Sequence, residues 1–451
     1  MQRIAWDHAV AELVENLSTL LRFDTTNPPG NETPAARWIA EVLARESIPS
    51  EILESAPGRG TLIARLRAAG PVAGDPLLLM GHLDVVPADP SEWRYPPFSG
   101  AVVGGEVWGR GALDMKGTVA TWLSVMLLAK RSGLPLKRDI ILMANADEET
   151  GGDMGARWIA ANHFEKIRGA GGLSEGGGSL IEINGQRYWT YQVSEKTSCK
   201  FKMTARGTGG HASVPTSDNA VVHLARAIAA LGSASLPVHI TPAFRAFVEG
   251  VAAYQPEPRR AAWLALVCDP DHAEEHLAAA TDDPGLRRRL RAMMRNTCTP
   301  TMLQAGSKIN VIPASAECLV DCRILSGQTK ESVEAEVKAV LAAAGIADKI
   351  QLEWMVRPIK KDSPVESALV DAMRQALKNH APGVPLIPAM STGGTDNEFL
   401  RHYDMPIYGF YPMLPGEAGG TVHAANERIS IKGLEFALKV AWDIVVAFCG
   451  A

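Results

Sequence analysis

The chain of 451 residues lacks several features that would assign it to a special class of protein. It has no run of about 18 uninterrupted apolar residues and no charged-then-apolar signal pattern at its N-terminus, so we expect neither a membrane span nor a secreted protein. It has no excess of basic residues, since its formal net charge is −5, and this argues against a nucleic-acid-binding protein. Its six cysteines are dispersed without a CxxC pair, which favours reduced thiols in a cytoplasmic protein.

The sequence does contain the alternation of strands and helices that is typical of an α/β fold. Its composition, 46% hydrophobic and 21% charged, is that of a globular protein, and its length allows two or three domains. Short apolar runs at residues 77–80 and 140–144 flank a segment with helical spacing of apolar residues, from Val119 to Leu127. Strand, helix and strand in this order predict a βαβ unit and a mainly parallel sheet.

The pattern changes near residue 195, where loosely alternating strands and a glycine-rich turn begin. We interpret residues 196–356 as an inserted α+β domain that contains an Ala- and Arg-rich helical segment at about residues 241–300. The α/β pattern returns after this insertion. Residues 1–195 and 357–451 should therefore form one discontinuous domain.

Five side chains that can bind a metal ion each lie just past an apolar run: His82, Asp114, Glu149, Glu175 and His423. Imidazole and carboxylate groups are common zinc ligands, and two zinc ions about 3.5–4 Å apart need a shared ligand. Asp114 would be that shared ligand, with His82 and Glu175 on one ion and Glu149 and His423 on the other. Three carboxylates and a bridging hydroxide would balance the charge of the two ions.

Two further carboxylates have supporting roles in this hypothesis. Asp84 follows His82 at strand spacing and would hold the far nitrogen of its imidazole. Glu148, beside Glu149, would act as general base towards the bridging water and then as acid towards the departing amine. Each residue taken alone also has an ordinary explanation: Asp114 could cap a helix that begins near Lys116, the glutamate pair could be a solvated surface, and single histidines are usually structural.

Eight segments, in this order along nearly the whole chain, resemble one family, the co-catalytic zinc metallopeptidases. That family includes aminoacylase, acetylornithine deacetylase, succinyl-diaminopimelate desuccinylase and glutamate carboxypeptidases. The matching segments are GHLDVVP (81–87), WRYPPFSG (93–100), GRGALDMKG (109–117), ADEETGG (146–152), SEGGG (174–178), GTGGHASVP (207–215), STGGTD (391–396) and VHAANERI (422–429). The resemblance implies the same five metal ligands, with Asp84 and Glu148 in the roles given above. The family sometimes has an Asp just before this Glu, and here that position is Ser174. Because Ser174 is a poor zinc donor, Glu175 is the ligand from this segment by default.

The resemblance also implies properties that the spacing of residues does not provide. The inserted domain would be a lid that often forms a homodimer contact, and the peptide bond after Asp114 would be cis. His211 would stabilise the oxyanion, frequently from the partner subunit. Four residues would contact the substrate: Asn310, Arg323, Gly394 and Thr395. Two Zn²⁺ ions per chain would be the cofactors, and Co²⁺ or Mn²⁺ can take their place.

The function implied is hydrolysis of an amide bond in an N-acyl amino acid or short peptide that carries a free carboxylate. One alternative is a dipeptidase or carboxypeptidase of the same family, and another is a non-catalytic metal-binding homologue. The pattern HAEEH at residues 272–276 formally matches an inverted zinc-protease motif, but its charged surroundings favour an exposed helix.

Overall fold

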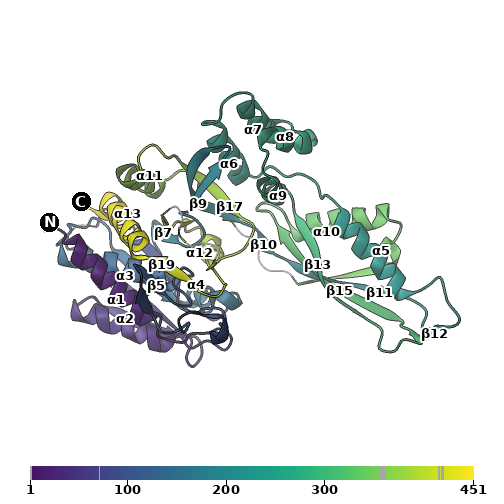
Figure 1. The fold of residues 1–451 in the computed structure, drawn as a ribbon, viewed down its shortest axis with the longest axis horizontal. Coiled ribbons are helices and arrows are strands. Elements are labelled where there is room, and N and C mark those ends of the chain that lie inside the picture. Colours follow the sequence, from purple (N-terminus) through teal and green to yellow (C-terminus); the bar gives the residue numbers. More distant parts are fainter. Residues whose placement is uncertain (1–2, 71, 356–360, 415–416, 418–420) are drawn as a thin grey trace. The chain divides into compact units, whose positions relative to one another are not determined.

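The computed structural model describes residues 3–70, 72–355, 361–414, 417 and 421–451. The chain forms two compact units (Figure 1). Unit 1 consists of Met1–Val193, Asp362–Ala389 and Thr395–Ala451, and unit 2 consists of Ser194–Lys361 and Met390–Gly394.

Unit 1 is built around a nine-stranded sheet with helices on both faces. Its helices are α1 (Trp6–Leu20), α2 (Thr33–Arg45), α3 (Lys116–Arg131), α4 (Ala156–Ile167), α11 (Ala368–His380), α12 (Asn397–His402) and α13 (Ile431–Cys449). The strands of the main sheet are β1 (Ser50–Glu54), β2 (Gly60–Leu66), β3 (Leu77–His82), β6 (Ile140–Asn145), β7 (Gly171–Ser174), β8 (Leu180–Ile183), β9 (Gln186–Glu195), β17 (Leu386–Ser391) and β18 (Ile407–Gly409). A smaller sheet contains β4 (Ala101–Val103), β5 (Glu106–Trp108) and β19 (Arg428–Ser430).

The strand order of the main sheet is β1-β2-β6-β3-β7-β18-β9-β17, with β8 paired to β9. The central pairs β6–β3, β3–β7 and β7–β18 are parallel, as the βαβ pattern predicted. The outer pairs β1–β2, β2–β6, β18–β9 and β8–β9 are antiparallel, so the sheet is mixed rather than mainly parallel. Short connections join β1 to β2 and β8 to β9, and these two pairs must be antiparallel because a parallel pair needs a long crossover connection.

The two central strands β3 and β6 are buried along their whole length. On one face, Leu78 and Met80 pack with residues of α4 and α12. On the other face lies α3, and a Cβ at Gly81 would come within 2.8 Å of the Val119 side chain. Glycine at position 81 therefore lets α3 approach β3 closely.

Unit 2 contains an antiparallel sheet with the order β10-β15-β11-β16, in which β13 also pairs with β15. Its strands are β10 (Thr197–Ser198), β11 (Lys200–Arg206), β12 (Gly210–His211), β13 (Thr297–Ala305), β14 (Val311–Ile312), β15 (Ser315–Ile324) and β16 (Ile350–Met355). Its helices are α5 (Ala220–Ser233), α6 (Pro242–Ala252), α7 (Arg259–Cys268), α8 (Ala273–Ala280), α9 (Pro284–Met293) and α10 (Lys330–Ala343). Every second residue of β15 is buried, because α5 and α10 cover one face of this sheet.

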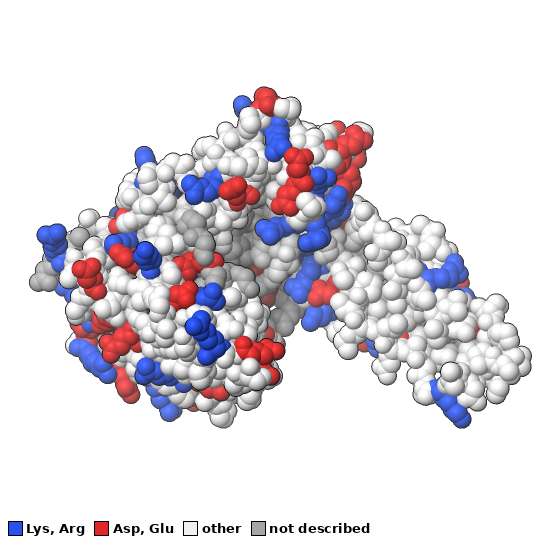
Figure 2. Space-filling view, viewed as in Figure 1, with Lys and Arg blue, Asp and Glu red and all other residues white. Residues whose placement is uncertain are grey.

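Two features of the described residues bear on the expected partners. None of their helices combines the length and apolar character that crossing a bilayer requires. On the face shown in Figure 2, basic and acidic side chains are interspersed over unit 1.

Candidate metal centre

Parallel strands bring three of the predicted ligand segments to one edge of the main sheet. His82 is the last residue of β3, and Asn145, its partner in the register, is the last of β6. Glu148 and Glu149 follow β6 in a short 3₁₀ turn, η2 (Glu148–Thr150), and Glu175 follows β7. Ligand sites of open α/β sheets form at the carboxyl ends of such strands.

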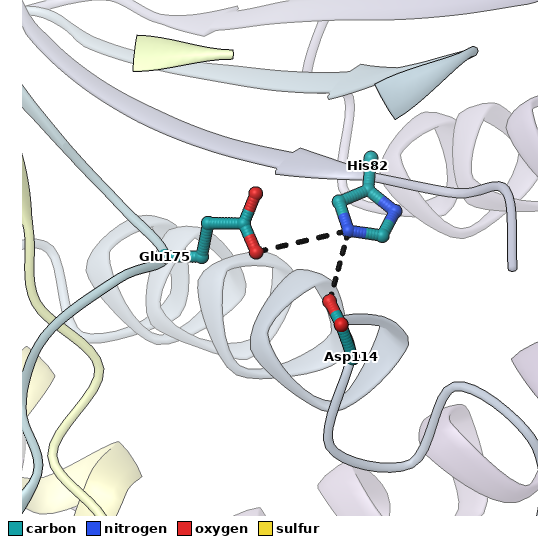
Figure 3. Close-up of side chains that lie close together, drawn as sticks. All are labelled: His82, Asp114 and Glu175. Atoms are coloured by element: carbon teal, nitrogen blue, oxygen red, sulfur yellow. Dashed lines mark hydrogen bonds and ion pairs between the residues drawn. The ribbon is translucent and has the colours of Figure 1, made fainter. Parts of the chain in front are cut away.

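The five predicted ligands form two groups that share Asp114. In the first group, Nε2 of His82 lies 3.0 Å from Oδ1 of Asp114 and 3.9 Å from Oε2 of Glu175 (Figure 3). In the second, Nε2 of His423 lies 3.1 Å from Oδ2 of Asp114 and 3.2 Å from Oε2 of Glu149. Within each group the potential ligand atoms lie within 4.8 Å of one another. The two oxygens of Asp114 therefore face two different histidines.

Asp114 does not cap the helix that follows it. Helix α3 has Met115 at its N-cap position, and no side chain makes a capping hydrogen bond there. The Asp114–Met115 peptide bond is cis, as the resemblance implied. The carboxylate of Asp114 is therefore available to the two histidines.

Asp84 fixes the main chain of the glutamate pair. Its carboxylate oxygens accept hydrogen bonds from the main-chain N–H groups of Glu148 and Glu149, both at 3.0 Å. Nδ1 of His82 donates to the main-chain carbonyl of Asp84 at 2.9 Å and lies 3.5 Å from its carboxylate. The main-chain carbonyl is thus the nearer partner of the imidazole, although we predicted the carboxylate in that role.

A buried polar network behind Asp84 was not found by reasoning from the sequence. Nδ2 of Asn27 donates to Asp84 at 2.8 Å and to Asp147 at 3.1 Å, and Nη2 of Arg59 donates to Asp147 at 2.7 Å. Glu32 Oε1 lies 3.0 Å from Arg59 Nη2 but accepts no hydrogen bond from the described residues, so this contact is an ion pair only. The sequence could have indicated Asp147, because it directly precedes the glutamate pair. Asn27, Glu32 and Arg59 lie far from that pair in the sequence, so no local pattern indicated them.

The two histidines of the centre carry raised pKa values. Burial by itself lowers the pKa of His82, but hydrogen bonds to Asp114 and Asp84 outweigh it and hold the pKa well above its ordinary value. The hydrogen bond to Asp114 raises the pKa of His423. Burial raises the pKa of Asp114, yet its bonds to both histidines bring it below the usual range. Cation binding would favour the neutral form of both histidines, because an imidazole must be neutral to bind a metal ion.

Three glutamates at the centre carry raised pKa values because burial disfavours their charged form. This holds for Glu148, Glu149 and Glu175, and neighbouring carboxylates add to the effect. Oε2 of Glu148 lies 4.0 Å from Nε2 of His82, so Glu148 borders the first group without belonging to it. A buried carboxyl with a raised pKa beside a ligand cluster is typical of a catalytic acid or base.

The sequence from residue 78 to residue 446 matches the model of peptidase family M20/M25/M40. The chain belongs to this family. The N-fatty-acyl-amino acid synthase/hydrolase PM20D1 of Homo sapiens is 29% identical over 379 residues, which cover 82% of this chain and 73% of that protein. The probable carboxypeptidase S-like 2 of Dictyostelium discoideum is 26% identical over 373 residues, which cover 79% of this chain and 68% of that protein.

Solved structures of the M20 family share the fold. The M20 family metallo-carboxypeptidase Sso-CP2 of Sulfolobus solfataricus matches with a TM-score of 0.68 at 21% identity, over 98% of this chain and 99% of that one. Human carnosine dipeptidase 1 matches with a TM-score of 0.67 at 14% identity, over 98% of this chain and 97% of that one. The predicted family and α/β fold are confirmed, and so is the prediction of a metallohydrolase that acts on amide or peptide bonds.

The residues that the resemblance assigned to oxyanion and substrate binding belong mostly to unit 2. His211 is exposed on β12, with Nδ1 2.6 Å from Oγ of Ser213, and the main-chain carbonyl of Asn310 accepts from Ala212. Arg323 donates two hydrogen bonds to Asp321, at 2.7 and 3.1 Å. Gly394 ends the second segment of unit 2, and Thr395 begins the last segment of unit 1. The roles of these five M20-family positions stay predictions.

The HAEEH pattern is not a third ligand group. Both of its histidines, His272 and His276, make hydrogen bonds to Asp269 at the surface. Among the described residues, ligand atoms from three or more potential ligand residues come within 4.8 Å of one another in the two groups around Asp114 only.

Proposed function

We propose that this M20-family chain binds two divalent cations, zinc in the first place, at the two groups that share Asp114. The observation that carries the proposal is the orientation of Asp114, whose two oxygens lie 3.0 and 3.1 Å from Nε2 of two different histidines. The donor set also fits, since imidazole nitrogens and carboxylate oxygens suit zinc and are accepted by cobalt and manganese. In addition, Oε1 of Glu149 is buried without a hydrogen-bond partner among the described residues, as a side chain kept for a cation would be.

The reaction we propose is amide hydrolysis with Glu148 as the proton carrier. Bound cations would polarise the substrate carbonyl and lower the pKa of a water molecule held at the centre. A carboxylate oxygen of Glu148 takes a proton from the attacking water and later delivers it to the nitrogen of the leaving amine. Burial raises the pKa of Glu148, which brings proton uptake and release closer to balance near neutral pH.

Other residues of the chain would hold the substrate. Asp84 keeps Glu148 in place through its main-chain N–H. His211 would donate a hydrogen bond to the oxyanion, and Arg323 and Asn310 would contact the substrate, with Arg323 exchanging its bond to Asp321 for the substrate carboxylate. Main-chain N–H groups at Gly394 and Thr395 would receive the carboxylate end.

The substrate we propose is an N-acyl amino acid or a short peptide with a free carboxylate. The name of the human relative, an N-fatty-acyl-amino acid synthase/hydrolase, supports the N-acyl class. The name of the Dictyostelium relative, a probable carboxypeptidase, favours the alternative of a peptidase. A non-catalytic homologue is the third possibility, and the presence of Glu148 beside the ligand groups argues against it.

A substrate panel with defined metal content tests the function. Metal-free protein is reconstituted with zinc, cobalt or manganese and assayed against N-acyl amino acids of increasing acyl length and against dipeptides. We expect two metal ions per chain and faster cleavage of the N-acyl substrates. Faster cleavage of dipeptides would establish the peptidase alternative, and no cleavage in any metal form would refute the proposal.

We further propose a cytoplasmic homodimer that forms through unit 2. Several large apolar side chains of unit 2 are exposed in the segments around β12, β13 and β14, namely Val214, Met302, Leu303, Ile309 and Val311. Exposed apolar patches of this kind mark interaction surfaces. A mass in solution equal to one chain of 48.3 kDa would contradict the dimer.

A further inference from the structure

Glu427 is a fully buried carboxylate in the same segment as His423, and the proposed reaction does not use it. Its oxygens accept four hydrogen bonds of 2.7 to 3.0 Å, from Nη1 of Arg110 and from the main-chain N–H groups of Gly111, Leu113 and Asp114. All four donors lie in the loop between β5 and α3. That loop carries the shared ligand of the metal centre.

Glu427 therefore joins two segments that are far apart in the sequence. Its oxygen Oε1 accepts from the main-chain N–H of Asp114 at 3.0 Å, while the side chain of Asp114 faces His423 at 3.1 Å. Its main-chain carbonyl accepts from Gly109 N–H at 3.0 Å, and the next residue, Arg428, pairs with Trp108 as β19 meets β5. The place of Asp114 relative to His423 thus depends on contacts made by Glu427.

The charge of Glu427 is balanced within this arrangement. Arg110 and Glu427 form an ion pair whose side chains are 3% and 0% exposed. Cζ of Arg110 lies 5.2 Å from the centre of the Trp93 ring, which fixes the guanidinium from its other side. Glu427 consequently adds no net charge next to the cluster of acidic ligands. It can hold the loop without competing for a cation.

We infer that Glu427 is a positioning residue that holds Asp114 at the distance from His423 at which both can bind the same cation. The inference rests on the proposed metal centre. A glutamine at this position keeps one acceptor oxygen and presents an NH2 group in place of the other, so one of the two pairs of donors loses its acceptor and the loop with Asp114 must shift. Removal of partners outside the ligand shell typically weakens metal binding about 10- to 100-fold.

Cobalt titration of the metal-free protein tests the inference. Visible absorption reports each Co²⁺ ion as it enters its site, and thermal unfolding reports whether a variant is folded. We expect the unsubstituted protein to bind two Co²⁺ ions, and Glu427→Gln to bind the ion at His423 about 10- to 100-fold more weakly. Glu427→Asp keeps the charge opposite Arg110 with a shorter side chain, so its loss of affinity should be smaller.

The matched control is Glu106→Gln. Glu106 lies on β5 of the same small sheet and accepts a hydrogen bond from Nε of Arg428 at 3.2 Å, but it has no contact with the loop that carries Asp114 among those described for its side chain. This variant should bind both ions as the unsubstituted protein does. The control separates a general disturbance of the small sheet from the specific effect on Asp114.

Each outcome decides the inference. Unchanged affinity for both ions in folded Glu427→Gln would overturn it and leave the proposed function standing. If that variant does not fold, unchanged affinity in Glu427→Asp overturns it instead. If the unsubstituted protein does not bind two Co²⁺ ions, the proposed function fails and this inference fails with it.

Discussion

The substitution Glu148→Gln separates proton transfer from metal binding. Glutamine has the shape of glutamate but cannot accept a proton at neutral pH. The main-chain N–H groups of residues 148 and 149 stay bonded to Asp84, since those bonds of 3.0 Å do not involve the substituted side chain. Glu149 should therefore keep its position 3.2 Å from His423, and both cations should remain bound.

The size of the effect follows from the role of Glu148 in two proton transfers. A positioned general acid or base contributes about 10²- to 10⁴-fold to a rate. Because Glu148 would serve first as base and then as acid, we expect a loss of turnover of about 10³- to 10⁴-fold, which corresponds to about 4–5.5 kcal/mol of activation free energy. The metal-free variant should be at least as stable as the unsubstituted protein, because burial already disfavours the charged form of Glu148.

Three measurements on one preparation test this reasoning. Metal content by elemental analysis should stay at two ions per chain, KM should change little, and kcat should fall by the amount given above. Glu41→Gln, an exposed substitution on α2, is the control and should leave all three unchanged. Turnover near that of the unsubstituted protein in Glu148→Gln, with both metals bound, would refute the assignment of Glu148.

Two further predictions concern the pH dependence of stability and the partner subunit. The pKa of Glu32 rises from 4.5 to about 7 through burial, and the pKa values of Glu148, His82 and His423 are also raised. A group whose pKa is higher in the folded than in the unfolded protein stabilises the fold at low pH, and this stabilisation is lost as the pH rises through the folded-state pKa. The unfolding temperature of the metal-free protein should therefore fall as the pH rises above about 4.5. In Glu32→Gln this fall in unfolding temperature should be smaller up to about pH 7. An unfolding temperature that rises over this range would contradict the assigned pKa shifts. If His211 acts in the partner's site, His211→Ala should lose kcat, and mixing it with Glu148→Gln in equal amounts should restore about a quarter of the full activity, because half of the dimers then contain one intact site. Loss in His211→Ala without recovery on mixing would place His211 in its own subunit's site, and unchanged kcat would exclude its role.

Much of the centre could be predicted because its residues lie next to regular elements. His82 is the last residue of β3 and Glu149 follows β6, and the apolar runs of both strands are continuous because both of their faces are buried. Parallel neighbours must end at the same edge, so the order of elements already brought these side chains together. His423 lies in a turn, so the order of the strands does not bring it to this edge as it does His82 and Glu149.

The sequence by itself determined the family, the α/β class and the identity of the five potential ligands, because short motifs and the period of apolar residues are local properties of a chain. Only the tertiary structure decided which residues hold the ligands in place. Asn27, Arg59 and Glu427 lie 57, 88 and 313 residues from the partners they hold, and no local pattern records such a contact. Buried polar groups must find partners wherever the fold brings donors and acceptors together, so these contacts are fixed by packing and not by spacing along the chain.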